Sequence, residues 1–159
     1  MDDPAQKFAD DALPPPDAAA LPHGRVRAQG FLANLAPEEP VEKTLQRLFG
    51  SRPIKDGSEA ITLELPLIAE DGGNVAMSVE VKSPMTPQSY VKAIYVLSDK
   101  NPRPLNAKFN LTPACGQAYV TAILRLADTG DVRAVAEMQD GALFMVKRSV
   151  RVVVAGCAA

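Results

Sequence analysis

Between residues 60 and 154, apolar and polar side chains alternate with a period of two. This spacing is typical of β-strands that bury one face. Turn-forming segments rich in Asp, Gly, Asn and Pro separate the alternating runs. The runs cover residues 61–67, 75–82, 90–97, 107–111, 118–126, 132–138 and 143–154. About seven strands with no helical pattern between them predict an all-β fold, an antiparallel sandwich or barrel.

One segment before the strands follows a helical period instead. Four apolar residues of the segment 40–50 fall on a single helix face: Val41, Leu45, Leu48 and Phe49. Pro40 suits the first turn of a helix and Gly50 suits its end. The sequence therefore predicts one short helix, which needs to dock on the strands to persist.

The first 40 residues differ in composition from the rest of the chain. They hold half of the 14 prolines, together with many alanines. Such a segment buries little apolar surface. We therefore expect three parts: a Pro/Ala-rich extension at 1–37, a folded domain at 38–154 and a C-terminal arm at 155–159.

Charge and hydropathy exclude two classes of partner. The formal net charge is -2, whereas a nucleic-acid-binding protein usually carries a basic face. No apolar run approaches the roughly 20 residues that a membrane-spanning helix needs. The first residues have neither the basic nor the apolar region of a signal peptide, so we expect either a cytosolic protein or one whose signal has been removed.

The residues for dedicated catalysis are missing from the predicted domain. The only histidine, His23, lies in the extension, where a general base or metal ligand would have little rigid support. The domain shows no Ser/His/Asp set, no Cys/His spacing for zinc and no Gly-rich phosphate loop. Catalysis by this chain alone is therefore not expected.

The two cysteines are the remaining candidates for chemistry. Cys115 sits in a turn that leads into a predicted strand, and a small, partly buried residue is its simplest interpretation. Cys157 is third from the C-terminal end of the sequence and follows small residues after the last strand. An exposed thiol near a chain end suggests a use, because such thiols oxidise readily. A functional thiol, an incidental one and a disulfide to Cys115 all remain open from the residues alone.

Several motifs of the predicted domain, in order, resemble the SoxY family of the bacterial thiosulfate-oxidising (Sox) system. They are Ser83-Pro84-Met85-Thr86, Tyr90-Val91-Lys92, the stretch LSDKNPRP at 97–104, residues 109–113, 125–127, 135–138, Asp140-Gly141 and the terminal Gly156-Cys157. The resemblance implies an immunoglobulin-like antiparallel β-sandwich with a short N-terminal helix and a flexible C-terminal arm. It also implies a periplasmic location and a heterodimer with a SoxZ-like subunit.

The resemblance further implies that Cys157 carries pathway intermediates covalently, as a thiosulfonate or a persulfide, with no other cofactor and no metal. The enzymes that would act on them are the c-type cytochrome SoxAX, the hydrolase SoxB and the sulfane dehydrogenase SoxCD. The family arm usually has glycines where this chain has Ala155, Ala158 and Ala159 around Gly156 and Cys157. Alanine restricts the backbone relative to glycine, so this arm is expected to be stiffer.

Other functions remain as alternatives. A related carrier tied to quinoprotein dehydrogenases is a close variant. The chain could instead be an immunoglobulin-like interaction module with an incidental terminal cysteine, or a thiol-disulfide protein that uses Cys115 and Cys157. Lys147, Arg148 and Arg151 precede the arm and are candidates to attract anionic intermediates, although solvated charges on a strand are the simpler interpretation.

Deleting residues 1–37 is expected to leave the thermal unfolding transition of the remaining domain largely unchanged, because the periodic apolar positions begin later. Scanning calorimetry of the truncated protein measures this. A loss of cooperativity would show that Phe31, Leu32 or Leu35 of the extension belongs to the core.

Overall fold

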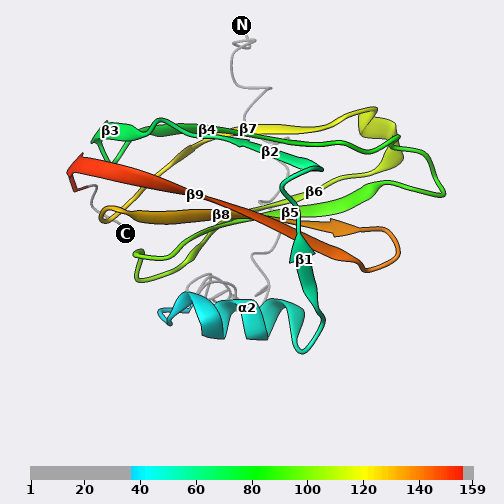
Figure 1. Cartoon of the computed structure of the whole chain (residues 1–159), viewed down its shortest axis with the longest axis horizontal. Coiled ribbons are helices and arrows are strands. Elements are labelled where there is room, and N and C mark those ends of the chain that lie inside the picture. The colour runs from blue at the N-terminus through cyan, green and yellow to red at the C-terminus, as the bar shows by residue number, and fades with distance from the viewer. Residues whose placement is uncertain (1–36, 156–159) are drawn as a thin grey trace, which may run out of the picture.

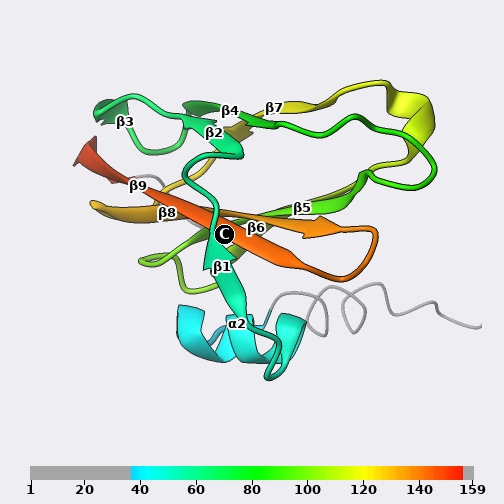
Figure 2. The ribbon, with the colours of Figure 1, turned by 45° about the vertical axis from the view of Figure 1, so that its right-hand side comes forward.

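The computed structural model describes residues 37–155, which fold into three layers (Figure 1). A six-stranded sheet lies in the middle, a three-stranded sheet covers one of its faces and the helix α2 (Val41–Phe49) covers the other. The turned view shows the same order, with α2 separated from the three-stranded sheet by the larger one (Figure 2). The predicted extension, with His23 and Phe31, lies almost wholly outside the described residues.

The larger sheet is built around one long strand, β9 (Leu143–Val154), which pairs antiparallel with β8 (Gly130–Met138). The sheet continues through β5 (Val91–Ser98) to the edge strand β6 (Leu105–Asn110). On its other side β9 pairs with two short parallel strands, β1 (Ile54–Asp56) and β3 (Ile68–Asp71). All six strands of this sheet therefore depend on β9 directly or through β8.

The smaller sheet has the order β2 (Ile61–Glu64), β4 (Val75–Val81), β7 (Ala118–Leu124), with antiparallel pairs throughout. Alternate residues of β4 are buried and exposed, as the sequence pattern predicts for a strand with one face in the core. The main core fills the space between the two sheets, with Val79, Ile94, Val96, Ala134 and Val150 fully buried there. The predicted β-sandwich is thus confirmed.

The number of strands differs from the prediction because two short strands, β1 and β3, lie outside the predicted runs. The run 61–67 holds only β2, which ends at Glu64; after Pro66 the chain crosses to the other sheet and forms β3 from Ile68, in a segment that the pattern assigns to no strand. Proline has no N–H to donate to a sheet ladder, so a central strand does not continue through it. With β1, which has too few residues to show a period, the described residues hold nine strands.

The helix begins and ends as predicted. Pro40 occupies the N-cap position, and Gly50 ends the helix with a φ of 61°, its N–H donating to the Gln46 carbonyl at 2.7 Å. Only glycine adopts such a conformation at little cost. Val41 and Phe49 are buried against the larger sheet, and the Phe49 ring meets Tyr95 edge to face at 4.9 Å between centroids.

Strand β5 is apolar on both faces because the helix covers the second one. Ile94 and Val96 point into the main core, whereas Tyr95 and Leu97 pack under α2. A strand that is apolar on both sides suggests from sequence alone a face left open for a partner. The tertiary structure corrects this expectation for β5, since the chain supplies the cover itself.

A buried carboxylate ties the C-terminal end of α2 to the sheet. Glu137 of β8 is 6% exposed, accepts a hydrogen bond from Tyr95 Oη at 2.9 Å and pairs with Arg52 Nη1 at 3.0 Å. Burial alone would raise the pKa of Glu137, but the hydrogen bonds from Arg52 and Tyr95 and the charge of Lys92 outweigh it, so the pKa lies below its usual value. The same burial and the neighbouring carboxylate raise the pKa of Tyr95 to about 12.

Replacing Glu137 by glutamine is expected to lower the free energy of unfolding by about 1–3 kcal/mol, because it removes charge-assisted hydrogen bonds from a buried site. Since the folded-state pKa is lowered, the carboxylate stabilises the fold above its unfolded pKa, and this contribution is lost as the pH falls through the folded-state value. Urea unfolding between about pH 3 and pH 6 should therefore show a weaker pH dependence for Glu137→Gln than for the parent. Tyr95→Phe, which keeps the carboxylate and Arg52, is the control and should retain most of the pH dependence. Equal pH profiles for Glu137→Gln and the parent would contradict the assignment.

Candidate functional site

The candidate site is the end of β9, where the predicted arm leaves the domain. Ala155 is the last described residue, and it is exposed. The other predicted arm residues, Gly156, Cys157, Ala158 and Ala159, lie outside the described residues. We call the end of β9, whose last residue is Val154, the attachment point of the arm.

Backbone pairing with β3 holds one edge of the last residues of β9, just before the arm. Ala69 is in register with Val152 and Asp71 with Val154. The N–H of Gly72 then donates to the Val154 carbonyl at 2.8 Å, which extends the ladder to the last residue of the strand. In Figure 1 the red end of β9 accordingly lies beside β3.

A side chain holds the opposite edge of the same stretch. Thr129 Oγ1 accepts a hydrogen bond from the Val152 N–H at 2.9 Å and donates to the Val152 carbonyl at 3.3 Å. It takes over where the β8–β9 pairing stops, since Gly130 and Val150 are the last pair in register. Both edges of β9 are therefore fixed close to the point where the arm begins.

Large apolar side chains are exposed around this attachment point. They are Leu67 and Ile68 next to and in β3, and Val153 and Val154 in β9. Ile123 of β7, 60% exposed, adds to them from the three-stranded sheet, where it lines an open groove of about 650 Å³ with Leu65, Pro66 and Ala76. Exposed apolar clusters of this kind usually mark contact surfaces.

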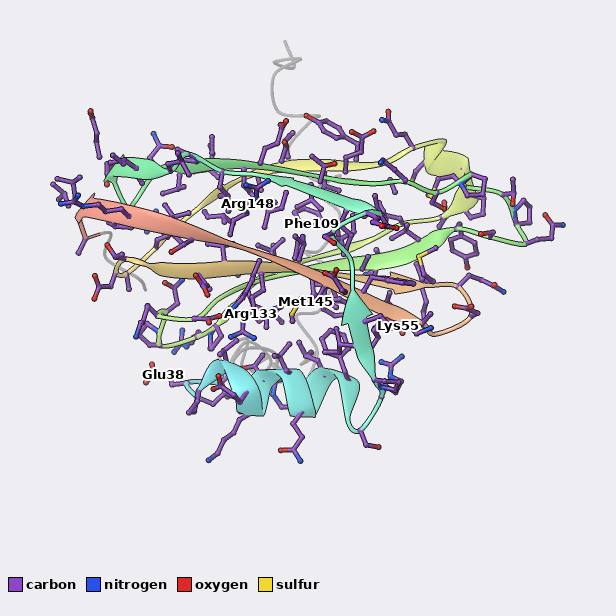
Figure 3. All side chains as sticks on the ribbon, in the orientation of Figure 1. Glu38, Lys55, Phe109, Arg133, Met145 and Arg148 are labelled. Carbon is purple, nitrogen blue, oxygen red and sulfur yellow. The ribbon has the colours of Figure 1, made fainter. Side chains whose placement is uncertain are left out.

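The three predicted cations do not converge on the arm. Successive residues of a strand point to opposite faces, so Arg148 lies on the side that faces the three-stranded sheet and Lys147 and Arg151 on the side of α2. Figure 3 shows this division, with Arg148 and Phe109 between the sheets and Arg133 and Met145 toward the helix. Lys147 pairs with Asp131 at 3.4 Å, and all three cations are exposed. Their arrangement fits solvated charges better than a binding site for an anion.

The second cysteine lies far from the attachment point. Cys115 is exposed in the short 3-10 turn Pro113–Cys115 that precedes β7. That end of β7 pairs with Val81, whereas the other end pairs with Val75 close to the Gly72 turn. Seven residues of strand span roughly 20 Å, and three residues of arm reach at most about 11 Å. A redox pair of Cys115 and Cys157 within one molecule is therefore disfavoured by geometry.

Among residues 37–155 no group of three His, Cys, Asp or Glu side chains lies close enough to hold a metal ion. No helix in that part of the chain is long and apolar enough to cross a membrane.

The sequence pattern did not identify the residues that secure the arm. Gly72 and Thr129 lie in segments that the pattern assigns to turns, and Leu126 is the last residue of the predicted run 118–126, which in the structure ends at Leu124. Their role depends on contacts between segments far apart in the chain. A sequence signal exists for Leu126 alone, since it belongs to the motif 125–127 that carries the family resemblance.

Comparison with known proteins identifies the family. The profile described as sulfur oxidation protein SoxY matches residues 45–157, more than half of the chain. The solved structure of the sulfur carrier protein SoxY from Chlorobium limicola f thiosulfatophilum is 28% identical and superposes with a TM-score of 0.60, covering 72% of this chain and 96% of that one. The search of curated proteins finds no match.

More distant structures share the fold alone. The superoxide reductase (neelaredoxin) from Ignicoccus hospitalis is 17% identical, with a TM-score of 0.53 over 58% of this chain and 80% of that one. A putative superoxide reductase from Thermotoga maritima gives the same identity and TM-score over 64% and 93%. The predicted membership is confirmed by the profile match and the Chlorobium structure together: this chain belongs to the SoxY family of sulfur oxidation proteins.

Proposed function

We propose that this protein is a covalent carrier of sulfur intermediates in thiosulfate oxidation, with Cys157 as the attachment site. One structural observation carries the proposal: β9 is held up to Val154 on the edge that faces β3 and up to Val152 on the opposite edge, and a thiol follows three residues after Val154 in the sequence. A carrier needs a rigid body and a reactive group on a short tether. The family membership supplies the class of chemistry.

The proposed loading step is an oxidative coupling. The Cys157 thiolate and the outer sulfur of thiosulfate form an S–S bond, and the two electrons released pass to a c-type cytochrome of the SoxAX kind. Hydrolysis by a SoxB-like enzyme releases the terminal sulfonate as sulfate and leaves a persulfide on Cys157. A SoxCD-like dehydrogenase then oxidises the outer sulfur to a sulfonate with oxygen from water, and the electrons pass to a cytochrome acceptor. None of these steps requires an acid or base from the carrier, and the Cys157 thiolate of the loading step is the only nucleophile that it supplies.

The arm sets the reach of the thiol. Three extended residues beyond Val154 span at most about 11 Å, enough to enter a shallow active site. Ala155, Gly156, Ala158 and Ala159 have small side chains, which keep the arm narrow. Alanine at three of these positions restricts the backbone more than glycine does, so this arm samples fewer conformations when free and loses less entropy on entering an enzyme.

A SoxZ-like subunit and a periplasmic location complete the proposal. The exposed apolar residues near the attachment point, Leu67, Ile68, Val153 and Val154, support a protein partner at this end of the molecule. The open edges of β6 and β7 offer further places for pairing. Catalysis then belongs to the partner enzymes, with this chain presenting the bound intermediate.

Intact mass spectrometry tests the attachment site. Incubation of the protein with thiosulfate, a SoxAX-type cytochrome and an electron acceptor should add the mass of one S2O3 unit, which is thiosulfuric acid less two hydrogens. The adduct should map to the C-terminal peptide and disappear in Cys157→Ser, because the arm of that variant has no thiolate to couple. Cys115→Ser is the matched control and should load fully. An adduct that persists in Cys157→Ser would refute the assignment.

The isolated chain is expected to self-associate, because large apolar side chains and strand edges are exposed without a partner. Light scattering at rising concentration measures this, with and without reductant. A dimer linked through Cys157 dissociates on reduction, whereas an association through apolar surfaces persists. A reduced protein that stays monomeric and gains no thermal stability from a SoxZ-like subunit would contradict the expectation.

A further inference from the structure

We infer that Asn101 is a positioning residue for the carrier arm, acting through a path of hydrogen bonds that ends at Val154. The inference rests on the proposed function for its biological meaning. Its structural content is independent, since every bond in the path joins residues of the folded domain.

The path begins at the buried side-chain amide of Asn101, which makes three hydrogen bonds. Asn101 is 8% exposed and lies in the loop between β5 and β6. Its Nδ2 donates to the Arg125 carbonyl at 2.7 Å and to Asn106 Oδ1 at 2.9 Å, and its Oδ1 accepts from the Ala127 N–H at 2.9 Å. Asn106 in turn donates to Ser98 Oγ, which fixes the orientation of the amide plane. A buried amide satisfied in this way holds one geometry.

Asn101 thereby holds the two peptide groups on either side of Leu126. Residues 125–127 follow β7 and belong to no strand, so sheet pairing does not position them. The Leu126 side chain is buried in the main core, and its N–H donates to the Gly72 carbonyl at 2.7 Å. The Leu126 N–H shares its peptide group with the Arg125 carbonyl, so the bond from Asn101 to that carbonyl sets the direction of the N–H.

Gly72 connects the 125–127 segment to the last residue of β9 by two backbone hydrogen bonds. Its carbonyl accepts from Leu126 and its N–H donates to the Val154 carbonyl at 2.8 Å, so one residue joins the 125–127 segment to the end of β9. The neighbouring Asp71 closes the same turn, accepting from the Gly73 N–H at 2.7 Å through Oδ1. Loss of the Asn101 amide would free residues 125–127, loosen Gly72 and release the last carbonyl before the arm.

This places Asn101 among residues that act on the direction of the arm rather than on the thiol. Small errors in position of a reacting group are costly, and misplacement by about 1 Å can slow a reaction about 100-fold. When the tether has only a few residues, a fixed end of β9 limits the positions that the thiol can take. The expected consequence is a weaker productive encounter with partner enzymes and an unchanged intrinsic reactivity of Cys157.

Hydrogen exchange measured by NMR on the full chain tests the path directly. In Asn101→Ala the Gly72 and Leu126 amides should exchange at least about tenfold faster, relative to the core amide of Val96, than in the parent. Tyr95→Phe is the matched control, because it removes one buried hydrogen bond on the helix side of the sheet. It should leave the ratio of Gly72 to Val96 exchange within about twofold of the parent. An unchanged ratio in Asn101→Ala, or an equal rise in Tyr95→Phe, would overturn the inference.

Asn101→Asp provides a second variant if the alanine variant fails to fold. Its carboxylate keeps an acceptor for the Ala127 N–H but faces the Arg125 carbonyl without a donor. Protonation at low pH restores a donor, so the Gly72 exchange ratio, corrected for intrinsic chemical exchange, should return toward the parent value as the pH falls. A ratio that does not vary with pH beyond that of the parent would count against the path.

Kinetics separate this inference from the proposed function. With a SoxB-type hydrolase and the loaded carrier as substrate, Asn101→Ala should lower kcat/KM at least about tenfold. Alkylation of Cys157 by iodoacetamide in a Cys115→Ser background should remain within about twofold of the parent. A parent protein that takes up no thiosulfate refutes the carrier function, while the exchange ratios still decide the role of Asn101. Equal kcat/KM values for parent and variant would refute the positioning role.

Discussion

The twelve-residue strand β9 is the constraint on which the rest of the structure depends. It pairs along one edge with β8 and along the other with β1 and then β3, so it links segments from both halves of the chain. A strand paired on both edges cannot shift by one residue without turning every side chain to the wrong face. The register of the larger sheet, and with it the position of Val154, follows from this strand.

The two faces of the larger sheet pack against different elements. The helix α2 closes one face through Phe49 and Tyr95, and the Glu137 network secures it there. The three-stranded sheet closes the other face and contributes the Gly72 turn that receives the end of β9. The helix and the three-stranded sheet thus pack on opposite faces of the larger sheet.

A carrier places different demands on a fold than an enzyme does. The chemistry proposed here needs one thiolate from this chain, and the acids, bases and redox centres belong to its partners. What the carrier must supply is a defined origin for a short arm and a surface that other proteins can approach. The bonds at Thr129, Gly72 and Asn101 serve the first demand, and the exposed apolar residues around Ile68 and Val153 suit the second.

The sequence by itself determined the class of fold, the helix from Val41 to Phe49, most of the strands and the family. These depend on local periodicity and on motifs, which a single chain displays directly. The site of attachment, Cys157, likewise comes from the sequence and stays a prediction. The tertiary structure alone decided that the chain changes sheets after Pro66 to form β3, that α2 covers β5, and that Asn101 is linked to the end of β9. The physical reason is that these features rest on hydrogen bonds and burial between segments distant in the sequence, and no local pattern encodes which distant segment a turn or a strand face will meet.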